Sequence, residues 1–239
     1  MKNNRSAANK RTPATPAQDQ ATVMALCLED LTKLFAATDL KPSETQLQAL
    51  SQLLVMLHKW NAALNLTAIK DLHEMTVLHV LDSAVLAPVL TAQLQSCGGN
   101  KVADVGTGAG FPGLVLAILH PEINFTLIDS IAKKLSFVRQ VVSALKLNNV
   151  ELINKRCESI EHEPFDCIVS RAFAPLERMV NWCLPLLKED GYFIAMKAHL
   201  EPEEIAAVPP TVTITNTIEL SVPTLAAKRQ AVLLQRQHS

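Results

Sequence analysis

The most constraining feature of this sequence is a glycine-rich stretch that follows a short apolar segment. Residues 101–113 have the sequence Lys-Val-Ala-Asp-Val-Gly-Thr-Gly-Ala-Gly-Phe-Pro-Gly. A strand pattern therefore runs into a turn with glycine at alternate positions, and a helical pattern follows. Glycine lets a backbone approach a ligand closely because it has no Cβ atom, and the first N–H groups of a helix are free to bind one. The stretch predicts a ligand site at the carboxyl end of a strand.

Strand and helix patterns alternate along the chain from this point. The expected strands are 101–105, 124–128, 150–153, 165–170 and 192–197, and the expected helices are 113–119, 131–146 and 175–187. Such alternation predicts a parallel sheet with helices on both faces. Two further strand patterns, 211–220 and 231–235, have no helix between them. They predict an antiparallel pair that closes the sheet.

Helical patterns dominate the region before the sheet. One helix is expected over 22–37, and a second after Pro42, where Ser43 and Gln46 have the spacing of a capping box. A third begins near Asp71 and runs towards Pro88. We therefore expect a disordered basic tail (1–20), an N-terminal helical subdomain (21–97) and a main α/β domain (98–239).

Composition and charge exclude several classes of protein. The 239 residues are 49% hydrophobic and 19% charged, which is a globular mix. The net charge of −1 excludes a protein that is basic throughout but allows a local basic patch. Residues 1–20 carry four cations, one carboxylate and, after Met1, no large apolar side chain, so we expect disorder there. No secretory signal pattern and no run of about 18 apolar residues is found, so no membrane span is expected.

The cysteines and histidines argue against a disulfide framework and a metal site. The five cysteines are an odd number and include no Cys-x-x-Cys pair. They fit a reducing cytosol better than a disulfide scaffold or a zinc ribbon. No histidine has a metal-ligand spacing to a cysteine or glutamate, so no metal is expected.

Two ligand classes compete for the glycine turn. Gly108, Gly110 and Gly113 form the G-x-G-x-x-G pattern of dinucleotide-binding proteins. Asp129 ends the next strand, 21 residues past Gly108, and suits a ribose-binding acid in either class. The longer pattern Asp-x-Gly-x-Gly-x-Gly, which begins at Asp104, fits better because its first glycine follows the strand directly. This longer pattern is typical of class I S-adenosylmethionine methyltransferases. A plain tight turn would not require three glycines together with an aspartate at the end of the next strand.

The stretch from Asp104 to Gly113 resembles the bacterial ribosomal RNA small subunit methyltransferase G family, also called glucose-inhibited division protein B. Further matching segments lie in register, and they are Leu57–Asn61, Asn65–Thr67, His79–Ser83, Leu127–Ser130, Ser170–Phe173 and Met196–Lys197. The resemblance implies a Rossmann-like, mostly parallel seven-stranded sheet with helices on both faces. It implies a cytoplasmic enzyme that uses S-adenosyl-L-methionine to methylate N7 of a guanine in the 530 loop of 16S rRNA. Ala198 departs from the family, which commonly has glycine there.

The resemblance also implies a set of cofactor-binding residues. They are Gly106, Gly108, Phe111, Asp129, Cys157, Glu158 and Arg171. Each has a plainer interpretation: turn geometry for the glycines, core packing for Phe111, helix capping for Asp129 and a solvated surface charge for Glu158. For Arg171 we favour a functional cation over a structural ion pair, because it ends a buried strand at the edge where substrate and methyl group must meet. No catalytic acid or base is expected, because N7 of guanine has no proton to lose.

The partner implied by the resemblance is 16S rRNA or the small ribosomal subunit. Candidates for phosphate contacts are Arg11, Lys133, Lys134, Arg139, Lys155, Arg156, Lys228 and Arg229, and weaker candidates for the base pocket are Asn65, His79 and Lys197. Three alternatives stay open: a methyltransferase of another substrate, an NAD-dependent oxidoreductase and a non-catalytic RNA-binding module. The short region after residue 200 argues against a separate dehydrogenase catalytic domain.

Overall fold

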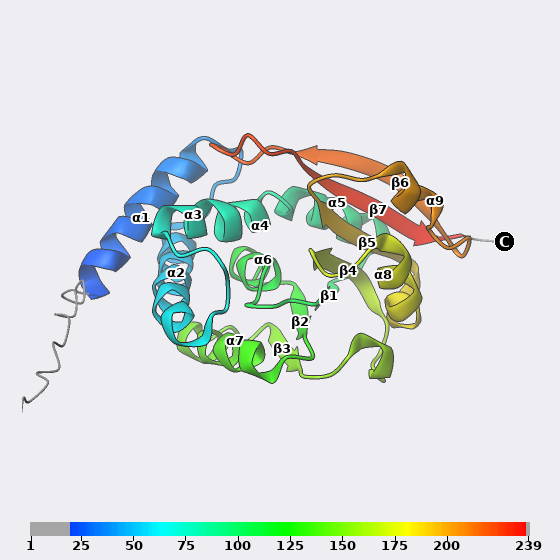
Figure 1. Ribbon diagram of the computed structural model, residues 1–239, viewed down its shortest axis with the longest axis horizontal. Helices are drawn as coiled ribbons and strands as arrows, with labels where there is room; N and C mark the ends of the chain where they lie inside the picture. The colour runs from blue at the N-terminus through cyan, green and yellow to red at the C-terminus, as the bar shows by residue number, and fades with distance from the viewer. Residues whose placement is uncertain (1–19, 238–239) are drawn as a thin grey trace, which may run out of the picture.

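A single seven-stranded sheet runs through the molecule (Figure 1). The computed structural model describes residues 20–237, so the predicted tail 1–20 lies outside the described residues except for Gln20. The strands are β1 Lys101–Val105, β2 Asn124–Ile128, β3 Val150–Ile153, β4 Phe165–Arg171, β5 Leu187–Lys197, β6 Val212–Leu220 and β7 Arg229–Arg236. Their order in the sheet is β3-β2-β1-β4-β5-β7-β6.

The first five strands are parallel, and β7 is antiparallel to both β5 and β6. The chain runs from β1 outward to β3 and then returns to place β4 on the other side of β1. Ligands of open α/β sheets bind at such a reversal point, outside the carboxyl ends of the strands. The predicted mostly parallel sheet with a closing antiparallel pair is confirmed.

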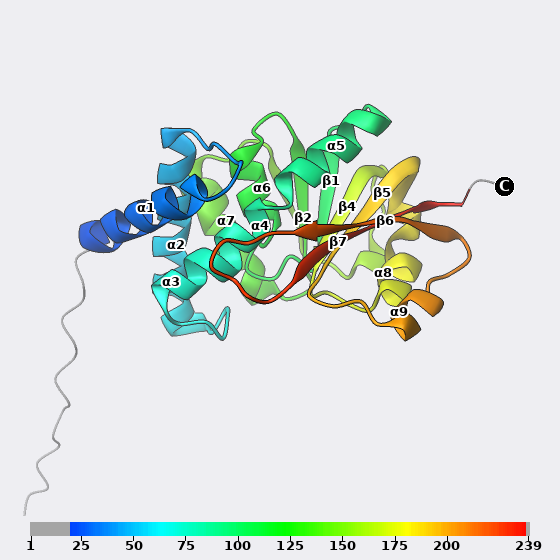
Figure 2. The same ribbon diagram turned by 90° about the horizontal axis from the view of Figure 1, so that it is seen from above.

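Helices cover both faces of the sheet. Their bounds are α1 Gln20–Ala36, α2 Glu44–Leu64, α3 Leu72–Met75, η1 Thr76–Leu81 (a π-helix), α4 Asp82–Ala84, α5 Ala87–Cys97, α6 Gly113–Leu119, α7 Ala132–Leu145, η2 Cys157–Ser159, α8 Leu176–Cys183, η3 Leu184–Leu186 and α9 Pro202–Ala206. Alternate residues of a strand point to opposite faces. Val102 accordingly packs in the cluster with α5, α6 and α7, and its neighbour Ala103 packs in the cluster with α8. Figure 2 shows α5 and α8 on opposite sides of the strands.

The N-terminal helices share a core with the sheet. Helix α2 packs against α6 and α7, and α1 packs on the outside of α2 (Figure 1). One cluster of buried side chains extends from Val23 of α1 to Leu233 of β7. The predicted capping box is present, because Ser43 Oγ accepts from the Gln46 N–H and the Gln46 side chain accepts from the Ser43 N–H. Asp71 likewise caps α3 by accepting from the Glu74 N–H.

One helical run of the N-terminal region is unusually long and apolar. Residues Leu72–Cys97 are long and apolar enough to cross a membrane, with a mean hydropathy of 1.6 in their most apolar window. The structure buries 67% of that window inside the protein. Burial against other helices and the sheet explains the apolar composition without a bilayer. Polar residues such as Asp82, Ser83 and Gln93 interrupt the segment, so it contains no unbroken run of about 18 apolar residues.

Candidate functional site

The glycine turn after β1 has a backbone that side chains disfavour. Gly106 has φ 68° and Gly108 has φ 61°, both in the left-handed region. The turn is tied to the next strand, because the N–H groups of Gly106 and Thr107 both donate to the Ile128 carbonyl. A Cβ atom on Gly106 would overlap the ring of Phe173, whereas one on Gly108 would meet nothing closer than 3.8 Å. Glycine is therefore required at position 106 by both conformation and space.

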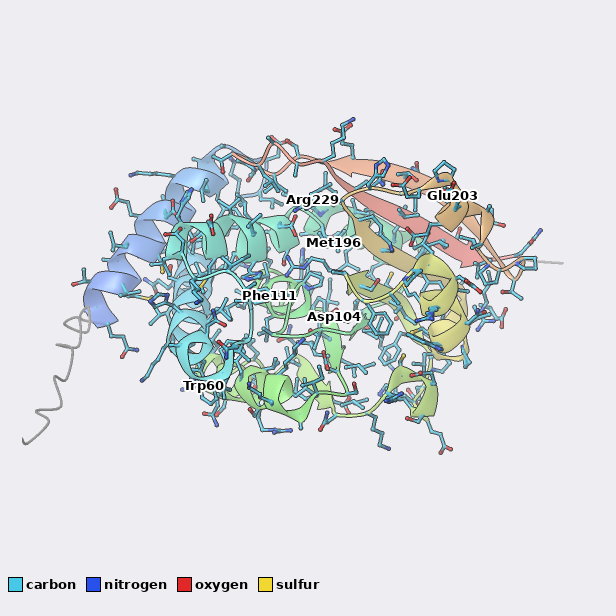
Figure 3. All side chains as sticks on the ribbon, in the orientation of Figure 1. Trp60, Asp104, Phe111, Met196, Glu203 and Arg229 are labelled. Carbon is cyan, nitrogen blue, oxygen red and sulfur yellow. The ribbon has the colours of Figure 1, made fainter. Side chains whose placement is uncertain are left out.

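Asp104 joins the two ends of this turn by hydrogen bonds. Its Oδ2 accepts from Thr107 Oγ1 at 2.6 Å and from the Gly113 N–H at 2.8 Å, at the start of α6. Its Oδ1 is buried and has no hydrogen-bond partner among the described residues. Burial raises the pKa of the Asp104 carboxyl to about 6, although the two hydrogen bonds favour the ionised form. Figure 3 shows Asp104 in the middle of the molecule.

Asp129 ends β2 beside the glycine turn. Its Oδ2 accepts from the Gly108 N–H at 2.8 Å, and its Oδ1 accepts from the Ile131 N–H at 2.8 Å. The second contact is to Ile131, the residue before α7, and α7 itself has no side-chain cap hydrogen bond, so the helix-capping interpretation of Asp129 is not met. Each carboxylate oxygen has more than one lone pair, so these bonds leave room for hydroxyl donors. The ribose contact of Asp129 stays a prediction.

A cavity of ≈ 340 Å³ opens at the carboxyl ends of β1, β2 and β3. Its lining residues are Gly106, Ile128, Asp129, Ser130, Ile131, Lys134, Lys155, Arg156, Cys157, Glu158, Ala172, Phe173 and Trp182. We call this cavity the strand-end pocket. Four of the seven predicted cofactor residues meet in it, namely Gly106, Asp129, Cys157 and Glu158. Gly108 adjoins it through its bond to Asp129, whereas Phe111 and Arg171 are not among the lining residues.

The far end of the pocket is made by the short η2 turn after β3. Cys157 is buried there, and its Sγ donates to Glu158 Oε2 at 3.3 Å. Glu158 itself is exposed, as expected for a surface carboxylate, yet it lines the pocket. The turn therefore presents a carboxylate at the end of the pocket away from the glycines.

Arg171 lies in a buried ion-pair network. Its Nη1 donates to Asp82 Oδ2 at 2.8 Å, and Asp82 Oδ1 accepts from Arg229 Nε at 2.7 Å. The Arg171 guanidinium also lies 5.6 Å from the centre of the Phe111 ring. The structural ion pair, which the sequence analysis ranked below a functional cation, is thus present. Two guanidinium groups share one carboxylate, so the network keeps a net positive charge beside the carboxyl end of β4. The functional role of Arg171 stays a prediction.

His79 joins this network as a neutral ring. Burial and the Arg171 guanidinium lower the pKa of His79 to about 4. The ring stacks on Phe111 with 4.9 Å between ring centres, and its Nε2 lies 2.9 Å from Thr67 Oγ1. Phe111 therefore packs against a histidine and an arginine and is buried, which is the core interpretation. The cofactor contact implied for it stays a prediction.

The other weak candidates have structural partners. Asn65 ends α2 in the left-handed conformation, with φ 49°. Lys197 Nζ donates to Glu204 Oε1 at 2.6 Å and to the Ala174 carbonyl at 3.1 Å. Ala198, the departure from the family, is not among the described non-glycine residues with positive φ. The backbone at this position therefore does not require glycine.

Sequence reasoning missed two aromatic residues of the pocket. Phe173 and Trp182 line it and contact each other edge-on, with 5.8 Å between ring centres. Phe173 follows Arg171 in a segment that resembles the family, so that segment was a usable signal. Trp182 lies on α8 with no local signal, because only the packing of α8 against the sheet brings it to the pocket.

The predicted basic residues fall into three groups. Lys134, Lys155 and Arg156 line the strand-end pocket, whereas Lys133 and Arg139 are exposed on α7. Arg229 is engaged with Asp82, and Arg11 lies outside the described residues. Lys228, just before β7, is exposed. Within residues 20–237, no group of three or more His, Cys, Asp or Glu side chains could hold a metal ion.

Known structures share the fold of this chain. An S-adenosylmethionine-dependent methyltransferase from Clostridium acetobutylicum matches with a TM-score of 0.52 and 11% identity over 65% of this chain and 92% of that one. The N-methyltransferase NodS from Bradyrhizobium japonicum matches with a TM-score of 0.50 and 14% identity over 66% of this chain and 97% of that one. The predicted class I methyltransferase fold is therefore confirmed.

Sequence comparison is more specific. The family model described as rRNA small subunit methyltransferase G matches residues 46–233. The ribosomal RNA small subunit methyltransferase G of Photobacterium profundum is 43% identical over 205 residues, covering 85% of this chain and 96% of its own. The protein of the same name from a Marinomonas species is 45% identical over 196 residues, covering 82% of this chain and 91% of its own. This chain belongs to the rRNA small subunit methyltransferase G family.

Proposed function

We propose that this protein transfers a methyl group from S-adenosylmethionine to N7 of a guanine in 16S rRNA, in the cytoplasm. The observation that carries the proposal is the strand-end pocket. It joins the glycine turn after β1, the acid after β2 and the η2 turn after β3 in a chain that belongs to this family. The 530 loop, and the choice between free rRNA and the small ribosomal subunit, are part of the proposal.

The residues of the pocket fit a ligand that is part nucleoside and part amino acid. Because Gly106 has no Cβ atom, the ring of Phe173 can pack against its backbone and form a wall of the pocket there. Asp129 offers carboxylate oxygens for hydroxyl donors halfway along the pocket, and Glu158 offers another acceptor at the η2 end. The cavity volume of ≈ 340 Å³ falls within the range of about 300–1,000 Å³ for small-molecule sites.

The mechanism needs positioning more than proton transfer. When bound, S-adenosylmethionine supplies an electrophilic methyl group on a sulfonium sulfur. N7 of guanine carries a lone pair and no proton, so no side chain has to act as a base. The protein must hold N7 in line with the methyl carbon and exclude water. The Arg171–Asp82–Arg229 network carries a net positive charge at the carboxyl end of β4, and this charge supports a proposed contact with guanine O6 or a phosphate oxygen of the target nucleotide.

The topology disfavours the alternative of an NAD-dependent oxidoreductase. The usual dinucleotide-binding sheet has the strand order 3-2-1-4-5-6. Here the antiparallel β7 lies between β5 and β6. A non-catalytic RNA-binding module would not need a pocket at the glycine turn.

The test is methyl transfer from labelled S-adenosylmethionine to two RNA substrates, free 16S rRNA and small ribosomal subunits that lack the modification. The label should appear in one guanine, and cleavage chemistry selective for N7-methylguanine should map it to the 530 loop. An excess of S-adenosylhomocysteine should abolish incorporation and serves as the control. Label at a ring carbon, an amino group or a ribose would refute the N7 assignment. No label in either RNA would refute the proposed substrate.

A further inference from the structure

Lys134 occupies a place in the strand-end pocket that its own helix does not explain. It is the third residue of α7 and lines the pocket beside Gly106 and Asp129. Its Nζ lies 3.8 Å from the point that a Cβ atom on Gly108 would occupy. The ammonium group is therefore directed back over the glycine turn.

The charge of Lys134 has no partner within the described part of the chain. No Asp or Glu of residues 20–237 lies within ion-pair distance of its Nζ, and no hydrogen bond from it is found there. A cation in the first turn of a helix also opposes the helix dipole, which favours negative charge there. Neither an ion pair within residues 20–237 nor helix stability accounts for a half-buried lysine at this point, and its position in the pocket points to a bound anion as its partner.

The layout of the pocket identifies that anion, provided that the proposed function holds. The pocket runs from the glycine turn past Asp129 to Cys157 and Glu158. If Asp129 holds the ribose, as its position at the end of β2 suggests, the two ends of the cofactor lie over the glycines and over the η2 turn. The adenine fits the η2 end, where Glu158 can accept from an exocyclic amine. The amino-acid part then lies over Gly106 and Gly108.

We infer that Lys134 Nζ binds the α-carboxylate of S-adenosylmethionine and of its demethylated product. A charged hydrogen bond of this kind contributes more than a neutral one. This assignment separates Lys134 from the cations predicted to contact RNA phosphates. Lys155 and Arg156, which line the pocket at its other end, stay in that set.

The experiment measures binding of two ligands by calorimetry, without RNA. One is S-adenosylhomocysteine, and the other is its carboxamide, in which an uncharged amide of similar shape replaces the α-carboxylate. Lys134→Met should weaken S-adenosylhomocysteine binding by about tenfold or more. The same variant should bind the carboxamide as the wild type does. Lys134→Arg should restore most of the affinity for the carboxylate.

Lys133 supplies the matched control, because it precedes Lys134 on α7, is exposed and does not line the pocket. Lys133→Met should bind both ligands like the wild type. Equal binding of S-adenosylhomocysteine by wild type and Lys134→Met would overturn the inference. Equal weakening of both ligands would also overturn it, because the charge would then not be what Lys134 recognises. Absence of binding by the wild type would instead refute the proposed function.

Discussion

At the scale of single residues, the buried carboxyl of Asp104 links the glycine turn to pH. Its pKa in the folded protein, about 6, lies above the ordinary value of 3.8 because burial disfavours the charged form. A raised pKa means that the stabilising contribution is fully present below pH 4 and is lost as pH rises through 6. Ionised Asp104 therefore costs stability at neutral pH.

Asp104→Asn should remove this dependence and keep an oxygen that accepts from Thr107 and Gly113. The free energy of unfolding of the variant, relative to the wild type, should rise by about 2 kcal/mol between pH 4.5 and 7.5. Urea denaturation at the two pH values measures it. If the unfolding free energies of variant and wild type differed by the same amount at both pH values, the pKa of Asp104 would be the same in the folded and the unfolded chain.

Gly106 and Gly108 offer a matched pair of substitutions in one turn. Both have positive φ, so alanine at either should cost about 1–2 kcal/mol of stability. Only at Gly106 does the added Cβ also collide with Phe173, which forms a wall of the pocket. Gly106→Ala should therefore lose S-adenosylhomocysteine binding, and Gly108→Ala should keep more of it. Calorimetry with the two variants checks this, and equal losses would contradict the role given to Phe173.

Arg171→Lys tests whether the arginine positions the substrate or acts by charge alone. Lysine keeps the charge beside Asp82 but loses the planar fork that also reaches the Leu78 carbonyl. Methyl incorporation into 16S rRNA should fall by about tenfold or more, while the unfolding free energy changes by about 1 kcal/mol. Near wild-type turnover would show that the electrostatic field suffices.

At the scale of elements, the sequence patterns predicted the bounds of those strands that depend on local sequence alone. Strands β1, β2 and β3 begin and end where the alternation of patterns placed them, because short apolar segments bounded by turns leave little choice. Strand β5 begins at Leu187 rather than 192, since Leu187 pairs with Phe165 of β4 before a register shift that leads to the pair Cys167–Tyr192. Pro88 starts α5 instead of ending a helix, which proline at a first turn allows. The π-helix over Thr76–Leu81 had no signal in the sequence.

The same division applies to the pocket. Gly106 and Asp129 were predictable because each follows a strand directly, and parallel strands end at one edge of the sheet. Cys157 was expected there only from the family resemblance. Trp182 and the pairing of Arg229 with Asp82 were not predictable, because they depend on contacts between distant parts of the chain. The functional role predicted for Arg171 stays a prediction, and its ion-pair partner Asp82, 89 residues away, had no local signal.

Helix α9 holds one wall of the pocket in place. Glu204 Oε1 accepts from the Leu176 N–H at 2.9 Å and from Lys197 Nζ at 2.6 Å. Lys197 also donates to the Ala174 carbonyl. These bonds tie down the segment that carries Phe173, which would otherwise be a free loop between β4 and α8.

Glu204→Ala should therefore weaken S-adenosylhomocysteine binding several-fold, although Glu204 is not a pocket residue. Glu203 is the matched control, since it is exposed on the same helix and lies at the periphery in Figure 3. Glu203→Ala should bind like the wild type. Calorimetry checks both variants, and an unchanged affinity in Glu204→Ala would show that the wall keeps its shape without the clamp.

At the scale of the whole molecule, Asp82 joins three parts of the chain. It lies on α4, and it pairs with Arg171 at the end of β4 and with Arg229 at the start of β7. Together with the continuous apolar core, this argues that the N-terminal helices and the sheet unfold together.

The two tryptophans make that cooperativity measurable, because one lies on each side of the predicted boundary at 97/98. Trp60 is on α2 against Phe137, and Trp182 is on α8 in the pocket wall. Trp60→Phe and Trp182→Phe each leave one fluorescent reporter, and both should show the midpoint that circular dichroism shows for the same variant.

Adding Asp82→Asn leaves two guanidinium groups without their carboxylate, so it should lower the unfolding free energy by about 3–5 kcal/mol at both reporters. If Asp82→Asn shifted only the Trp60 reporter, or if that reporter changed at lower urea than circular dichroism, the helices would be a separate unit, and the ion pairs would be a contact between domains.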